Sequence, residues 1–138
     1  FVGGRDRRET REASLRAKAL AASMGKTIKT YCMMTVIADE NDGEALRRVQ
    51  DYRDGVDEGA VRGMLESYGM AGNAMTDRAQ GAFMTQMVAG SPEKCVTLIE
   101  LFMRDAEVDG LMFIFDDYTQ GLRMTGEKIL PALRTLFA

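Results

Sequence analysis

The chain has 138 residues, of which 46% are hydrophobic and 28% are charged. This length predicts one domain or part of a larger one, and the composition is typical of a globular protein rather than a disordered chain. The formal net charge of −3 at pH 7 gives no electrostatic basis for binding nucleic acid. The apolar runs are far shorter than the roughly 20 residues of a membrane-spanning helix. We therefore expect neither nucleic acid nor a membrane as a partner.

The cysteine and histidine content restricts the chemistry further. The chain has two cysteines, Cys32 and Cys95, and no histidine. A Ser-His-Asp triad, a Cys-His dyad and a histidine-based metal site are therefore excluded within these residues. Cys32 falls in a buried strand and Cys95 on a buried helix stripe, which indicates inert core thiols. We expect a cytoplasmic protein, because its cysteines suit a reducing compartment, and we expect no metal site.

In chain order, the first elements are a strand end, a helix and a buried strand. Residues 1–4 have the pattern of a strand end, and the chain begins with Phe rather than Met, so we expect that it enters a fold midway. Small and apolar residues recur every three or four positions over residues 8–24, which predicts a helix. The expected apolar face of this helix is Ala13, Ala17, Leu20, Ala21 and Met24. Residues 27–38 become almost wholly apolar, as in a parallel strand buried on both faces.

Two helices and a long loop are predicted next. Asn41 can cap a helix whose apolar stripe begins at Ala45, with Glu44 as the capping-box partner. A second helix is expected over residues 58–68. Residues 69–81 contain three glycines and few bulky anchors, which predicts a mobile loop.

The remaining pattern alternates between strands and helices. A strand is expected over residues 82–89, a helix from Ser91, a strand over 111–115 and a helix over 118–128, with Pro131 breaking or restarting a last turn. Four strand candidates joined by helices predict an α/β fold with parallel strands and right-handed crossovers.

Two strand ends could carry chemistry. Residues 90–93, Gly-Ser-Pro-Glu, place free amides at a helix start, which can hold a phosphate, although an ordinary Ser91 N-cap is the favoured interpretation. Asp116 and Asp117 follow the last strand, and the carboxyl ends of parallel strands face the site in such folds. Paired carboxylates there could bind a metal or act as acid and base, although a structural cap is again favoured.

Several stretches resemble one enzyme family. Residues 33–42, Met-Met-Thr-Val-Ile-Ala-Asp-Glu-Asn-Asp, the turn at 90–93 and the run 108–118 are similar to the bacterial luciferase-like flavin monooxygenases. Residues 52–56 and 115–118 resemble the pyrimidine monooxygenase branch, which opens the uracil ring. The resemblance covers nearly the whole chain, and the order and spacing of the motifs carry it.

The resemblance implies that residues 1–138 are the C-terminal part of a (β/α)8 TIM-type barrel, because such barrels need roughly 250 residues. It implies a monooxygenase that uses molecular oxygen and reduced FMN, supplied by a separate flavin reductase, on a small organic substrate for which a pyrimidine is the candidate. It also implies a homo-oligomer, with the FMN contacts mainly outside this segment. Residues 69–81 correspond in position to the family's mobile lid. Arg78, Phe115 and Asp116 are the candidate substrate or lid contacts, and no catalytic residue can be assigned.

Two alternatives stay open. The same fold can use a deazaflavin for hydride transfer instead of FMN, and these residues do not separate the two. The chain could also be a stand-alone α/β binding module without catalysis, which the lack of histidine fits.

Overall fold

The computed structural model describes residues 1–4, 6–69, 82–83 and 85–138. Three parallel strands within these residues form one sheet in the order β2-β1-β3. The central strand is β1 (Tyr31–Ala38), flanked by β2 (Gln86–Gly90) and β3 (Gly110–Phe115). The predicted fold class, α/β with parallel strands, is confirmed.

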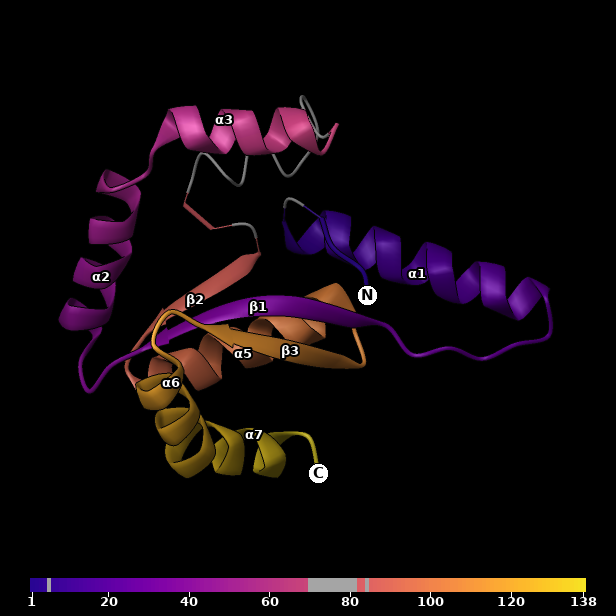
Figure 1. The fold of residues 1–138 in the computed structure, drawn as a ribbon. Coiled ribbons are helices and arrows are strands. Elements are labelled where there is room, and N and C mark those ends of the chain that lie inside the picture. The colour runs from indigo at the N-terminus through magenta and orange to yellow at the C-terminus, as the bar shows by residue number, and fades with distance from the viewer. Residues whose placement is uncertain (5, 70–81, 84) are drawn as a thin grey trace.

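Helices precede, connect and follow the three strands along the chain. The bounds are α1 (Arg7–Ser23), α2 (Asp42–Asp54), α3 (Glu58–Ser67), α5 (Pro92–Ala106), α6 (Tyr118–Met124), a π-helical turn η1 (Thr125–Ile129) and α7 (Leu130–Leu136). In Figure 1, α5 lies behind β3, α6 and α7 lie below the sheet, α3 lies above it, and α2 stands beside the end at which β1 finishes. Within the described residues, no helix combines the length and the apolar character needed to cross a bilayer.

The strands are fewer and shorter than the sequence predicts. Residues 1–4 form no strand, although the Val2 amide donates to the Tyr31 carbonyl (2.7 Å) and holds this segment beside the start of β1. β1 begins at Tyr31 rather than at residue 27, because Thr30 is held in a loop by the Asp109 side chain. β2 begins at Gln86 rather than at residue 82. The prediction of four strands is therefore wrong for the described residues.

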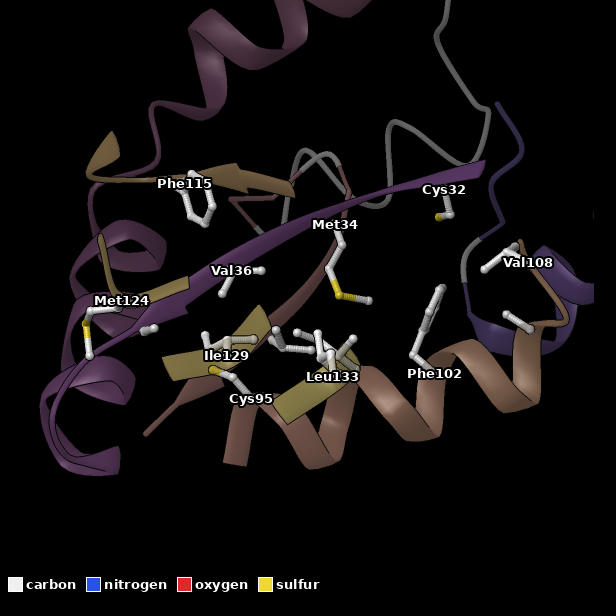
Figure 2. Close-up of a cluster of buried hydrophobic side chains, with 14 residues drawn as sticks. Cys32, Met34, Val36, Cys95, Phe102, Val108, Phe115, Met124, Ile129 and Leu133 are labelled. Atoms are coloured by element: carbon white, nitrogen blue, oxygen red, sulfur yellow. The ribbon is translucent and has the colours of Figure 1, made fainter. Parts of the chain in front are cut away.

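The main core lies between one face of the sheet and the helices below it. Figure 2 shows Met34 and Val36 of β1 pointing toward Phe102 of α5 and Ile129 of η1. These side chains are at most 4% exposed, and burying each one contributes roughly 1.5–3 kcal/mol. Because successive strand residues face opposite sides, this packing also fixes which residues lie on the other face.

Among the described residues, the opposite face of the sheet is covered near its carboxyl end. Ile37 is fully buried there against Ala45 and Val49 of α2. Farther from that end, Met33 and its register partner Met112 are 38% and 42% exposed. α2 therefore covers the carboxyl end of this face and leaves the rest open among the described residues.

Polar contacts decide which face of α1 is buried. The prediction that Leu20 and Met24 lie on the buried face of α1 is wrong, because these residues are 65% and 62% exposed. The Ser14 hydroxyl instead donates to the Glu107 carbonyl (2.9 Å) and lies 2.8 Å from the Thr30 hydroxyl. This helix packs against α5 through small polar side chains, which a search for apolar periodicity does not detect.

As predicted, a last helical segment restarts at Pro131, which lies in the first turn of α7, although the backbone stays helical from α6 through η1. A proline inside a regular α-helix lacks an amide and clashes with the carbonyl four residues earlier, which is that of Glu127. The wider π turn η1 ends at Ile129, directly before α7 begins. The π turn thus lies where it can relieve this clash.

Candidate functional site

The carboxyl ends of the three strands meet at one edge of the sheet. Ala38 is the register partner of Gly90, and Val36 is the partner of Phe115. The residues that follow the strands therefore come together at this edge, as in other parallel α/β folds. They bring polar side chains beside the end of the sheet that α2 covers.

Arg48 of α2 is the centre of an ion network at this edge. Its Nε donates to Oδ2 of Asp116 (3.0 Å), and its Nη2 makes a second contact with the same oxygen. Its Nη1 donates to Oδ2 of Asp39 (3.3 Å). The side chains of Arg48, Asp116 and Asp39 are only 16%, 8% and 21% exposed. Arg48 therefore joins the ends of β1 and β3 through partly desolvated charges.

Tyr52 and Gln120 extend this network. Tyr52 follows Arg48 by one helical turn, and its hydroxyl donates to Oδ2 of Asp116 (3.0 Å). Gln120 of α6 donates from Nε2 to Oδ2 of Asp39 and to the Ala38 carbonyl, both at 3.2 Å. We call these five residues, Asp39, Arg48, Tyr52, Asp116 and Gln120, the edge network.

The edge network shifts the pKa values of three of its members. Burial alone would lower the pKa of Arg48, but its interactions with Asp116 and Asp39 outweigh this burial and raise it. Burial and the interactions with Asp116 raise the pKa of the Tyr52 phenol, so it remains a hydrogen-bond donor at neutral pH. Burial alone would raise the pKa of Asp39. The hydrogen bonds from Gln120, from the Glu40 amide and from Arg48 outweigh this and lower it. Asp39 therefore stays ionised as an acceptor.

The helix start at Ser91 is a structural cap. The Ser91 hydroxyl accepts from the Lys94 amide (3.3 Å), as an N-cap does. Asp42 fills the position that a phosphate would take, since its Oδ1 accepts from the Ser91 amide (2.7 Å) and its Oδ2 pairs with Lys94. A Cβ on Gly90, which has φ +150°, would lie 2.8 Å from the same Asp42 oxygen. The capping interpretation is confirmed, and no phosphate site is formed here.

The structure separates the predicted site residues. Asp116 lies in the edge network. Asp117 is the N-cap of α6, because its Oδ1 accepts from the Gln120 amide (2.9 Å). Phe115 is 6% exposed and lies in the core, with its ring against Tyr118. Arg78 lies outside the described residues.

Three members of the edge network were not found from the sequence. Arg48 and Tyr52 lie on the flank of the helix stripe that carries Ala45 and Val49, so their spacing gave a weak signal. Gln120 gave none, because its role depends on where α6 crosses the end of β1.

An aromatic surface adjoins the network. The rings of Tyr52 and Phe83 meet edge to face with centroids 6.1 Å apart. Phe83 and Met87 pack against the small core under α2. An anionic carboxylate and two aromatic rings are thus neighbours at the carboxyl edge, an arrangement suited to a flat ligand with polar edges.

The chemistry available at this edge is binding rather than nucleophilic attack. No group of three or more potential metal ligands occurs in the described part of the chain. Burial raises the pKa of the Cys95 thiol to about 11, so this thiol is not an activated nucleophile. Carboxylate, phenol and amide groups can instead accept or donate hydrogen bonds to a bound molecule.

The chain is similar in sequence to pyrimidine monooxygenases. No family model matches the chain. It is 30% identical over 127 residues to the pyrimidine monooxygenase RutA of Acinetobacter baylyi, covering 86% of this chain and 34% of that protein. The chain thus spans about a third of the length of this relative.

Solved structures share the fold. DmoA from Hyphomicrobium sulfonivorans superposes with a TM-score of 0.74 at 18% identity, and the long-chain alkane monooxygenase LadA with 0.75 at 16%. Each match covers 98% of this chain and 36% of the other. The predicted resemblance is confirmed: the chain is a relative of the pyrimidine monooxygenases and has the fold of part of a luciferase-like monooxygenase.

Proposed function

We propose that the protein containing this chain is a flavin-dependent monooxygenase that acts on a small organic substrate, with a pyrimidine as the first candidate. The observation that carries the proposal is the 30% identity to a pyrimidine monooxygenase over 86% of the chain. The partly buried edge network supports it, because ligands of parallel α/β folds bind at the carboxyl ends of the strands.

The helix starts among the described residues are not favourable places for the flavin phosphate. The α-helices that begin after a loop are closed by side-chain caps from Asp6, Asn41, Asp57, Ser91 and Asp117. Three of these caps are carboxylates, those of Asp6, Asp57 and Asp117, and their negative charge disfavours a phosphate at the same helix start. We therefore propose that reduced FMN, delivered by a separate reductase, is held mainly by residues outside this chain, and that this chain forms part of the substrate side of the pocket.

The test uses the full-length protein with a flavin reductase, FMN, NADH and uracil. A monooxygenase places one oxygen atom of O2 into the product and reduces the other to water, with electrons from the reduced flavin. We expect uracil-dependent oxygen uptake and, with isotopically labelled oxygen, one labelled atom in the ring-opened product. Oxygen uptake that uracil does not change would contradict the proposal. Oxidation of a reduced deazaflavin without oxygen uptake would favour the hydride-transfer alternative.

Three further expectations belong to this proposal. Arg78 contacts the substrate or the flavin phosphate, the protein is a homo-oligomer, and it resides in the cytoplasm. If Arg78→Ala leaves kcat/KM as high as the exposed control Arg62→Ala does, the role of Arg78 is refuted. Light scattering and cell fractionation test the other two.

A further inference from the structure

The two oxygens of the Asp116 carboxylate have different surroundings. Oδ2 receives the Arg48 guanidinium and the Tyr52 hydroxyl. Oδ1 has no hydrogen-bond partner among the described residues, although the side chain is only 8% exposed. Within this part of the chain, the one fully buried side-chain oxygen or nitrogen without a partner is Oγ1 of Thr125. Oδ1 of Asp116 is therefore reachable from solvent while the rest of its side chain is covered.

Asp39 and Asp42, two carboxylates near Asp116 at this edge, have both oxygens engaged in hydrogen bonds. Asp39 uses Oδ1 for the Glu40 amide and Oδ2 for Arg48 and Gln120. Asp42 uses both oxygens to hold Ser91 and Lys94. Asp116 alone among these three combines a fixed orientation with an oxygen that is free to accept.

We infer that Asp116 determines substrate specificity by accepting, through Oδ1, a hydrogen bond from a ring N–H of the substrate. The inference rests on the proposed function and adds the substrate class, a planar heterocycle with an amide or imide N–H. An ionised carboxylate only accepts hydrogen bonds, so the matching group must be a donor. The Tyr52 hydroxyl contacts this carboxylate, and the Tyr52 ring together with the Phe83 ring that packs against it offers an apolar surface to a flat ring.

Arg48 and Tyr52 act as positioning residues in this arrangement. Both bind Oδ2, so they prevent the carboxylate from rotating and keep Oδ1 directed away from them. The acceptor oxygen is therefore already oriented when a substrate N–H binds to Oδ1, which lowers the entropy cost of binding. A substrate whose nitrogen carries a methyl group cannot donate and would leave this partly covered charge without a partner.

The test compares uracil with the two singly N-methylated uracils in the full-length protein. We expect the wild type to prefer uracil over one methylated analogue by about tenfold to hundredfold in kcat/KM, the range for one hydrogen bond to a charged group. In Asp116→Asn, this preference should fall to about threefold or less. Each preference is a ratio measured in one variant, so a loss of folded protein cancels.

Asp117→Asn is the matched control. It makes the same chemical change one residue away, and asparagine also serves as an N-cap, so the preference for uracil should stay at the wild-type value. Equal preferences in the two variants would overturn the inference and leave the proposed function intact.

Calorimetric titration with uracil separates the inference from the proposed function. If the wild type binds uracil without turning it over, and Asp116→Asn alone weakens binding about tenfold or more, the site is upheld and the monooxygenase proposal fails. If the wild type neither binds nor turns over uracil, both fail.

Discussion

Replacing Arg48 by methionine should destabilise the protein far more than the same change one residue earlier. The substitution keeps a long apolar side chain and removes the charge. It leaves Asp116 and Asp39, 8% and 21% exposed, without their shared cation. Removing one partner of a fully buried ion pair costs about 3–5 kcal/mol. Because this pair keeps some solvent contact, we expect a loss of about 2–3 kcal/mol in the free energy of unfolding.

Arg47→Met is the control. Arg47 lies on the same helix and also contacts two carboxylates, those of Glu44 and Asp51, but all three side chains are more than half exposed. Exposed pairs of this kind contribute about 0–1 kcal/mol. The two variants therefore differ in burial rather than in the type of substitution.

Urea titration of the full-length protein, followed by circular dichroism, measures both changes. The difference between the two variants should be about 1–3 kcal/mol. If the unfolding midpoints of the two variants agree within error, with equal slopes, the edge network is not a stabilising element. The view that it fixes α2 over the strand ends would then be refuted.

Three further perturbations test the packing, the titration and the reactivity of the chain. In Gly121→Ala the new Cβ would clash with the Phe115 ring, so thermal unfolding should show that the free energy of unfolding falls by about 1–3 kcal/mol. In the control Gly126→Ala the new Cβ has no atom within 4 Å, so the free energy of unfolding should fall by less than about 1 kcal/mol. The hydrogen bond from the Thr30 amide, followed by the interaction with Lys18, lowers the pKa of Asp109 in the folded protein. The ionised Asp109 therefore stabilises the fold fully above its ordinary pKa of about 3.9, and this stabilisation is lost as the pH falls through the lower pKa of the folded state. The unfolding free energy should therefore fall less between about pH 6 and about pH 3 in Asp109→Asn than in the wild type, and an equal fall would contradict this assignment. Cys95 is fully buried with a pKa of about 11, so iodoacetamide at neutral pH should label it only after urea is added, and rapid labelling of the native protein would show that this part of the core opens.

The sequence predicts those features of the fold that depend on local chemistry. The apolar run that becomes β3, the N-caps Asn41 and Ser91, and the helix from Pro92 all follow from residue type and spacing. The start of β1 does not, because residues 27–30 have strand composition but are held as a loop by Asp109, nearly 80 positions away. A pattern cannot show a contact of this range.

The candidate site likewise contains residues that the sequence predicts and residues that it does not. Asp116 could be predicted, because a residue that follows a parallel strand lies at the carboxyl edge whatever the helices do. Arg48 meets it across 68 positions, and this pairing depends on how α2 lies over the sheet. Asp116 and Asp117 looked like two equivalent carboxylates, yet α6 begins directly after Asp117, which is its N-cap. One therefore becomes a cap and the other a member of the edge network.

The edge network links the stability of this region to its capacity to bind. Ala45 and Val49 hold α2 against Ile37 and have no directional preference, so they allow the helix to rotate slightly about its axis. Arg48 and Tyr52 remove this freedom, because both must reach the same oxygen of Asp116. The contacts that fix α2 are thus the contacts that leave Oδ1 free and oriented. Weakening them should loosen the helix and reduce the discrimination between N–H and N-methyl substrates together, whereas loss of an exposed pair such as Arg47–Asp51 should change neither.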